Sequence, residues 1–361
     1  MTTIEIPGFR LYNQAIESTS FTTPAEVVSR MCAIQAQDYS MAKWAIGKRM
    51  AGATDVMVEA AADRGEILRT HLLRPTWHFV SSADIYWLLT LTAPRIKASM
   101  KARNRELELT PGLLVASFEL FENSLSGGKH LTREELSVIL QAANINTGDN
   151  RLSHILMEAE LEGIVCSGRK KGSKLTYALL SERIPYRIML TQDVSLAKLA
   201  GSYFTSHGPA TVKDFAWWSG LAAADVRKAM ELAKPGLISE SIGDEQYWFS
   251  GQSAGIASNA TSVHLLPAFD EFLISYKDRS SSLSLTHNRK AVSDNGIFRP
   301  IIVIDGQVAG LWKRTTKNDR VTIGTGFFHT PTPKQIKLVE AEAQAYGFFI
   351  GKKIEMGSYE L

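Results

Sequence analysis

The sequence predicts an α+β protein of three tandem winged-helix units followed by a C-terminal β-barrel-like module. The order helix, helix, two short strands recurs three times, and the sequence changes to strand-like runs from residue 262. Similar units in tandem favour a curved, extended body. The predicted domains are 1–125 (first winged helix with connecting helices), 126–190 (second, with a basic wing), 191–258 (third) and 259–361 (β-rich, with a late helix).

The first unit is expected to contain helices over 24–34, 42–50 and 55–63 and a hairpin with strands 67–72 and 76–80. Thr23-Pro24 is a helix-start signal, because proline suits the first helical position. Thr54-Asp55 offers a cap for the third helix. The two strand runs alternate in polarity, and Arg74-Pro75 marks the turn between them.

The second unit is the most informative stretch of the chain. Thr132 and Glu135 have the spacing of a capping box, and a second helix from about Asn150 carries apolar residues at three- and four-residue steps. Two short strands, 164–166 and 175–179, follow. The turn between them holds Arg169, Lys170, Lys171 and Lys174. Such a basic hairpin beside an exposed helix suits a phosphate backbone, although a solvated turn is the alternative.

The third unit is expected to have helices from about Asp193, Thr211 and Ala222, then strands at 237–238 and 247–249. The C-terminal module is expected to have strands 263–266, 301–304, 308–312 and 321–323 and a helix over 333–346. Asp305-Gly306 between two apolar runs is a strong hairpin signal. These strands predict a small barrel or sheet.

Composition limits the possible functions. The formal net charge is only +3, from 40 Lys and Arg against 37 Asp and Glu, so a nucleic-acid role must depend on clustering. Residues 95–105 form one further basic cluster, and Lys313, Arg314, Lys317 and Arg320 form another. For each cluster, the alternative is an ordinary solvated face.

Cys32 and Cys166 are the only cysteines, too few for a disulfide framework or a thiolate zinc site, and no metal site is expected. This composition fits a reducing cytoplasm. The first residues lack the basic start and apolar run of a signal peptide, and no uncharged stretch approaches the length of a membrane span. We therefore expect a soluble protein.

Four spaced motifs carry a family resemblance. They are Ala33-Ile34-Gln35-Ala36-Gln37-Asp38 with Ala42, Trp44 and Ala45 after it, and the segments 68–78, 208–220 and 265–270. In this order, they resemble the signatures of bacterial winged-helix DNA glycosylases related to the azinomycin-resistance enzyme. The resemblance covers about residues 8–350.

The resemblance implies hydrolysis of the N-glycosidic bond of an alkylated or crosslinked purine in duplex DNA, by a cytoplasmic, nucleoid-associated enzyme. It also implies that Gln35 and Gln37 line the active site. Glutamine offers a carbonyl acceptor and an NH2 donor, so one can hold water and the other the sugar or phosphate. A cationic alkylpurine leaves without a strong acid, so fixed amide dipoles suffice.

Helix geometry raises a difficulty for this pair. On a regular helix of 3.6 residues per turn, side chains two positions apart point about 200° apart. Both glutamines can face one site only if the helix unwinds near Gln37. The alternative is a helix terminus whose glutamines make capping and solvent contacts. Asp38 is a further catalytic candidate as a water-activating base, and its alternative is to cap a local turn.

Other side chains have two possible uses. His71 and His78 flank the first hairpin and could contact DNA, although hydrogen-bonded structural histidines are the alternative. Asp270-Glu271 could share a proton or hold a cation, and we favour a buried partner for Arg or Lys. Trp217-Trp218 could stack on bases, but the helical context favours a place in the core.

The sequence thus predicts a monofunctional DNA glycosylase that needs no cofactor and acts as a monomer. The predicted DNA-binding residues are Arg69, His71, Arg74, His78, Arg169, Lys170, Lys171, Lys174, Lys313 and Arg314. A non-catalytic winged-helix regulator is the alternative, but regulators usually dimerise to match two half-sites. A protein-interaction scaffold is a third possibility, which salt-dependent DNA binding would exclude.

Overall fold

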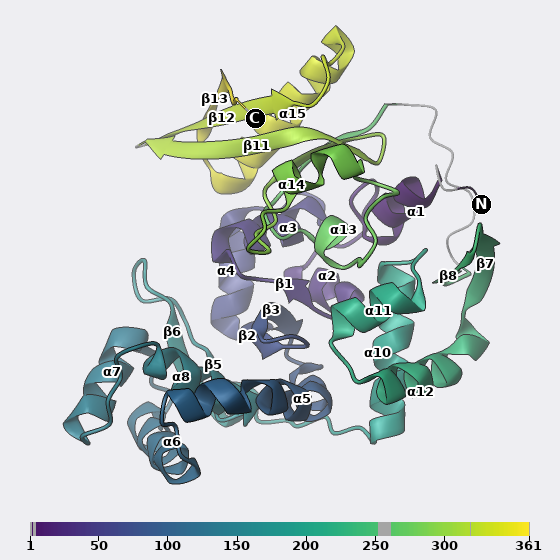
Figure 1. Ribbon diagram of the computed structural model, residues 1–361. Coiled ribbons are helices and arrows are strands. Elements are labelled where there is room, and N and C mark those ends of the chain that lie inside the picture. Colours follow the sequence, from purple (N-terminus) through teal and green to yellow (C-terminus); the bar gives the residue numbers. More distant parts are fainter. Residues whose placement is uncertain (1, 3–4, 252–260, 318, 361) are drawn as a thin grey trace.

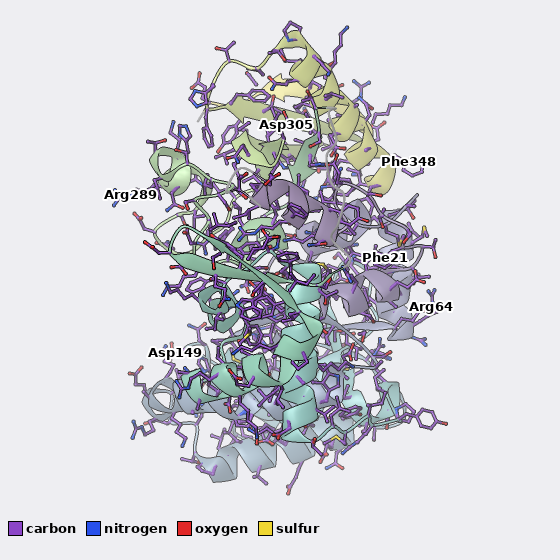
Figure 2. All side chains as sticks on the ribbon, turned by 90° about the vertical axis from the view of Figure 1, so that its right-hand side faces the viewer. Phe21, Arg64, Asp149, Arg289, Asp305 and Phe348 are labelled. Atoms are coloured by element: carbon purple, nitrogen blue, oxygen red, sulfur yellow. The ribbon has the colours of Figure 1, made fainter. Side chains whose placement is uncertain are left out.

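A computed structural model describes residues 2, 5–251, 261–317 and 319–360. The C-terminal sheet lies at one end of the molecule, helices α6–α8 lie at the other, and α2–α4 with β1–β3 lie between them (Figure 1). In the turned view of Figure 2, the exposed side chains of Arg64, Asp149 and Arg289 project from the outer surface.

The N-terminal elements are α1 (Ile6–Asn13), α2 (Pro24–Met31), β1 (Ile34–Gln35), α3 (Tyr39–Lys48), α4 (Asp55–Arg64), β2 (Ile67–Leu72) and β3 (Thr76–Ser81). The strands form an antiparallel sheet in the order β1-β3-β2, so the predicted hairpin is confirmed. The helix predicted to about Ile34 is wrong at its end. It stops at Met31 because Cys32 turns to a φ of +65°, after which the chain extends and pairs with β3.

The next elements are α5 (Ile85–Glu106), α6 (Pro111–Leu125), β4 (Leu131–Thr132), α7 (Arg133–Ala142), α8 (Arg151–Leu161), β5 (Val165–Ser167) and β6 (Thr176–Leu179). The capping box at Thr132 and Glu135 and the hairpin β5–β6 are confirmed. The connecting helices expected within 1–125, whose bounds the sequence did not predict, are α5 and α6, and the basic cluster 95–105 lies within α5.

The third segment contains α9 (Leu180–Arg183), α10 (Gln192–Ser206), α11 (Val212–Ser219), α12 (Ala223–Ala233), the 3-10 turn η1 (Lys234–Gly236), β7 (Ile238–Ile242) and β8 (Glu245–Phe249). Three helices, α10–α12, and then a hairpin therefore follow in the predicted order. The hairpin β7–β8 is antiparallel, and Trp248 also exchanges backbone hydrogen bonds with Ala210 ahead of α11.

The C-terminal elements are β9 (Val263–Leu266), α13 (Glu271–Ile274), the 3-10 turn η2 (Leu285–His287), α14 (Asn288–Ala291), β10 (Ile301–Ile304), β11 (Gln307–Lys317), β12 (Arg320–Phe327), α15 (Pro333–Ile350) and β13 (Lys353–Ser358). The predicted Asp305-Gly306 hairpin joins β10 to β11.

The predicted barrel does not form. The sheet order is β13-β12-β11-β10-β9, and the two outer strands do not pair, so the sheet is open. The sequence did not predict β13, which follows α15 and pairs in parallel with β12. It adds one strand at the edge of the sheet opposite β9.

A shared core joins the first segment to the C-terminal sheet. Trp44 of α3 donates from Nε1 to the carbonyl of Leu265 in β9 over 2.8 Å, and its ring packs against Tyr346 and Phe349 of α15. Burial of such aromatic area stabilises the contact by several kcal/mol in order of magnitude. In the described residues, no helix is both long and apolar enough to cross a membrane.

Candidate active site

The two glutamines lie at the end of β1 and in the bend that follows it. Gln35 pairs with His78 of β3, and the N–H of Ala36 continues the ladder by donating to the Trp77 carbonyl over 2.7 Å. β1 ends at Gln35, and Gln37 lies in a bend just before α3. The helix expected here is therefore wrong, and both glutamines lie outside regular helix.

The two amides differ in their surroundings. Gln35 is buried, and its side-chain carbonyl accepts from the Ala36 N–H over 3.0 Å. Gln37 is exposed, and its side chain has no hydrogen-bond partner in the part of the chain that the structure describes. The Gln37 amide can therefore meet a ligand without breaking an existing contact.

Asp38 caps α3. Its Oδ1 accepts from the N–H groups of Ser40 and Met41, each over 3.1 Å, and from the Ser40 hydroxyl over 2.8 Å. The capping alternative is thus confirmed. Oδ2 has no hydrogen bond among the described residues, so one carboxylate oxygen stays available beside Gln37.

Arg314 links the C-terminal sheet to this corner. From β11, its guanidinium donates to the hydroxyls of Ser40 and Tyr346. Arg314 is half-buried, whereas its neighbour Lys313 is exposed and lies with Nζ 4.3 Å from the centre of the Tyr359 ring. Lys313 therefore presents its charge to solvent, and Arg314 supports the start of α3.

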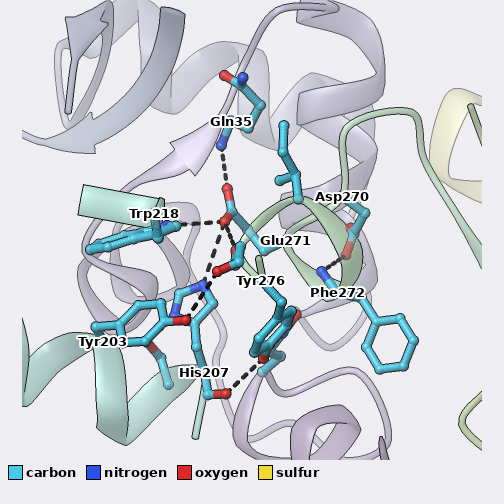
Figure 3. Close-up of polar contacts among 12 residues, drawn as sticks. Gln35, Tyr203, His207, Trp218, Asp270, Glu271, Phe272 and Tyr276 are labelled. Carbon is cyan, nitrogen blue, oxygen red and sulfur yellow. Dashed lines mark hydrogen bonds and ion pairs between the residues drawn. The ribbon is translucent and has the colours of Figure 1, made fainter. Parts of the chain in front are cut away.

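A buried carboxylate holds the other side of the glutamine segment. Glu271 is 1% exposed and accepts from the Gln35 backbone N–H over 2.6 Å, from Trp218 Nε1 over 3.2 Å, and from the Ser275 hydroxyl (Figure 3). Burial opposes ionisation, but the interactions with His207, Ser275 and Gln35 outweigh it and lower the pKa of Glu271 to about 2. Glu271 is therefore an anion that positions β1.

His207 lies on the inner side of this carboxylate. Its Nε2 is 3.5 Å from Glu271 Oε2, and its Nδ1 is 2.8 Å from the Ser206 hydroxyl. Burial lowers the pKa of His207, although Glu271 acts in the opposite direction. Stacking on Tyr203, with ring centres 4.9 Å apart, fixes the imidazole plane.

Asp270 has the structural role that the sequence favoured. It forms a bidentate ion pair with Arg49, with Oδ1 2.8 Å from Nη2 and Oδ2 2.9 Å from Nη1. Both side chains are fully buried. Sequence reasoning did not distinguish the roles of Asp270 and Glu271, because adjacent acids give no local signal of their different partners.

The two histidines of the first hairpin are buried. His71 Nδ1 lies 2.5 Å from Oε2 of the buried Glu160, and its ring packs on Trp77 at 3.9 Å between centres. Burial lowers the pKa of His78 to about 4, so it is neutral, and its Nδ1 lies 3.0 Å from the Thr76 carbonyl. Both rings face the interior in this conformation, which fits the structural alternative and not the predicted contact with DNA.

Arg74, near the tip of the hairpin, is half-buried beside the ring of Trp217. Its guanidinium lies 5.3 Å from the Trp217 ring centre, and Arg279 lies 5.6 Å from the same ring. Burial and the charge of Arg74 lower the pKa of Arg279 to about 10. Trp217 is 39% exposed and Trp218 is buried, so the predicted core position is wrong for the first and confirmed for the second. No sequence signal pointed to Arg279, which only tertiary structure brings here.

The cations of the basic wing already contact other groups of the protein. Its contacts are Lys170–Glu59 (3.4 Å), Lys171–Glu135 (2.5 Å), Lys174–Glu134 (3.3 Å), and Arg169 Nε to the Asp63 carbonyl (3.2 Å). Three of its four cations therefore already have an acidic partner from α4 or α7. DNA would have to compete with these exposed and half-buried pairs, which are individually weak.

Comparison with known proteins assigns the family. The chain matches, over residues 28–349, the family model described as DNA glycosylase AlkZ-like. The chain belongs to the AlkZ-like DNA glycosylase family. The family resemblance seen in the sequence is thereby confirmed, and a DNA repair glycosylase is favoured over a transcriptional regulator.

Two comparisons extend the match to nearly the whole chain. The interstrand DNA cross-link repair glycosylase of Streptomyces sahachiroi is 25% identical over 353 residues, covering 94% of each chain. The solved structure of the S. sahachiroi DNA glycosylase AlkZ superposes with a TM-score of 0.81 at 22% identity, covering 99% of each chain. The fold is therefore that of AlkZ. Within the described residues, no three His, Cys, Asp or Glu side chains converge to hold a metal ion.

Proposed function

We propose that this glycosylase is monofunctional and hydrolyses the N-glycosidic bond of cationic N-alkylated or crosslinked purines in duplex DNA. The observation that carries the proposal is the unpartnered Gln37 amide, which follows directly after Gln35 and Ala36, the residues that Glu271 and Arg69 hold by hydrogen bonds to the backbone. The crosslink in the name of the Streptomyces relative is consistent with such a substrate.

In this mechanism, water adds to the anomeric carbon as the glycosidic bond breaks. The bonding electrons stay on the purine nitrogen and neutralise the positive charge of the lesion, so the base leaves without a protein acid. Gln37 orients the water and Gln35 the sugar, while the free oxygen of Asp38 can take up the proton that water releases. Rate enhancement comes from fixed dipoles in place before the reaction.

The surroundings of Lys43 favour a monofunctional enzyme. Lys43, on α3 just after the glutamine motif, is buried with Nζ 2.8 Å from Asp55 and 2.7 Å from Glu59. Both carboxylates bind Nζ, so this amine is engaged in ion pairs and is not presented to the sugar for Schiff-base formation. The expected product is an abasic site with the strand intact.

The predicted units and contacts complete the proposal. Three winged-helix units, with boundaries near residues 126, 191 and 259, would bind the duplex. The protein would act as a monomer. Lys313, Arg74 and the basic wing would contact phosphates, which position the duplex but carry no sequence information. His71 and His78 are left out of these contacts because they are buried.

The test uses identical duplexes that differ only in the modified base. Purified enzyme should release 7-methylguanine and 3-methyladenine, revealed as strand breaks after alkali, and should leave uracil and 8-oxoguanine in place. Borohydride should trap no covalent complex. Efficient uracil release would require leaving-group activation and would overturn the mechanism. Trapping of a covalent complex would overturn the monofunctional assignment.

A further inference from the structure

A cavity of about 340 Å³ lies between the first hairpin and the basic wing. Aromatic side chains from three elements line it: Tyr39 of α3, Trp77 and Phe79 of β3, and Tyr177 of β6. Its volume falls within the range of about 300–1,000 Å³ typical of small-molecule sites, which are mostly apolar with a few polar groups. Flat aromatic walls of this kind suit a planar ring system.

Arg69 is the polar group that makes this cavity unusual. It is only 9% exposed, lines the cavity, and stacks on Trp77 with its guanidinium carbon 3.9 Å from the ring centre. Nε donates to the Ala36 carbonyl, but the two terminal nitrogens make no hydrogen bond or ion pair within the described part of the chain. These terminal nitrogens are therefore available to an acceptor that enters the cavity.

The cavity is joined to the glutamine motif on both sides of Gln37. Ala36, which precedes it, is held by Arg69 over 2.9 Å. Tyr39, which follows two residues later, forms part of the cavity wall. A base released beside Gln37 therefore has the cavity as its neighbouring space.

We propose that this cavity binds the purine base as it leaves the sugar, with the ring against Trp77 and Tyr39 and the Arg69 guanidinium on its acceptor atoms. This inference rests on the proposed function. Arg69 repels a lesion that is still cationic. Once the glycosidic electrons reach the purine nitrogen, the base is neutral with an additional lone pair, which the guanidinium attracts. The cavity therefore favours the departed base over the bound lesion.

Binding of free 7-methylguanine to the full-length protein, measured by calorimetry, tests the proposal without any excision step. Arg69→Met removes the donors, and Ala62→Leu fills the cavity from α4, where Ala62 lines it. Each variant should bind the base at least about tenfold more weakly. Arg69→Met loses a charge-assisted hydrogen bond, and Ala62→Leu occupies the space that the purine ring needs. Ala60→Leu, on the same helix but outside the cavity lining, should bind like the parent.

Thermal melting establishes that each variant is folded, and Ala62→Leu is decisive because it leaves the Arg69–Ala36 bond intact. Parent-like binding by Ala62→Leu, or no binding by the parent, overturns the proposal. So does displacement of 7-methylguanine by equimolar inorganic phosphate, which would assign Arg69 to an anion. Excision of 7-methylguanine from DNA without binding of the free base refutes the cavity alone. Binding without excision refutes the proposed function alone.

Discussion

Glu271 accepts a 2.6 Å hydrogen bond from the backbone N–H of Gln35, although 236 positions separate the two residues in the chain. The bond holds the strand that carries the glutamine motif from the core side. Arg69 holds the next residue, Ala36, from the hairpin side. Glu271 and Arg69 therefore position the motif from two sides through hydrogen bonds to its backbone.

Replacing Glu271 with glutamine should reduce the free energy of unfolding at pH 7 by at least about 2 kcal/mol, because buried donors lose a charged acceptor. The folded-state pKa of Glu271 is about 2 against an ordinary value of 4.5. Its stabilisation is therefore present above pH 4.5 and is lost as pH falls toward 2. Urea unfolding at a series of pH values should show the difference between parent and Glu271→Gln shrinking over that range. Glu119→Gln, at an exposed position on α6, is the control, and equal stability of parent and Glu271→Gln at pH 7 would contradict the assigned role.

Gln35→Ala and Gln37→Ala should each lower single-turnover release of 7-methylguanine by at least about tenfold, or about 1.4 kcal/mol of barrier. Affinity for the duplex should change little, since neither amide is assigned to a phosphate. Gln246→Ala, on the distant hairpin β7–β8, provides the comparison. Wild-type release rates in both motif variants would show that the active site lies elsewhere.

Asp38 variants separate capping from catalysis. Asn is as good an N-cap as Asp, so Asp38→Asn should keep the stability of the parent, whereas Asp38→Ala should lose about 1 kcal/mol. If the free Oδ2 takes up the proton from water, Asp38→Asn should lower release of 7-methylguanine although the fold is intact. Full activity in Asp38→Asn would leave Asp38 with its capping role alone.

Removing the acids that pair with the wing should strengthen DNA binding. Glu134→Gln with Glu135→Gln frees Lys174 and Lys171, and glutamine at 135 can still complete the capping box with Thr132. Titrations at several salt concentrations should give tighter binding and a steeper slope of log affinity against log salt, by up to about 0.9 for each new phosphate contact.

Neutralising Arg169, Lys170, Lys171 and Lys174 together should have the opposite effect, about equally for every duplex sequence. A parent-like affinity and slope in both sets of variants would make the wing a solvated turn. Contact with the backbone would then pass to Lys313 or to the arginines around Trp217.

The sequence alone determined the features that depend on neighbouring residues. The capping box at Thr132, the cap at Thr54, and the Asp305-Gly306 turn all lie within a few residues of the groups that they satisfy. Local hydrogen bonding therefore sufficed to predict most helices and hairpins. Spaced motifs also sufficed to predict the family, since their order does not depend on geometry.

Only the tertiary structure decided the conformation and partners of the candidate site. Gln35 is in a strand because His78 supplies a backbone ladder and Glu271 accepts its N–H, and both lie far away in sequence. The sheet is likewise open because its two edge strands, β13 and β9, do not pair with each other. The partner of an ionisable side chain depends on which acids the fold brings near it. His71 pairs with Glu160 and Lys174 with Glu134, so residue type alone could not show whether these side chains bind DNA or other residues of the protein.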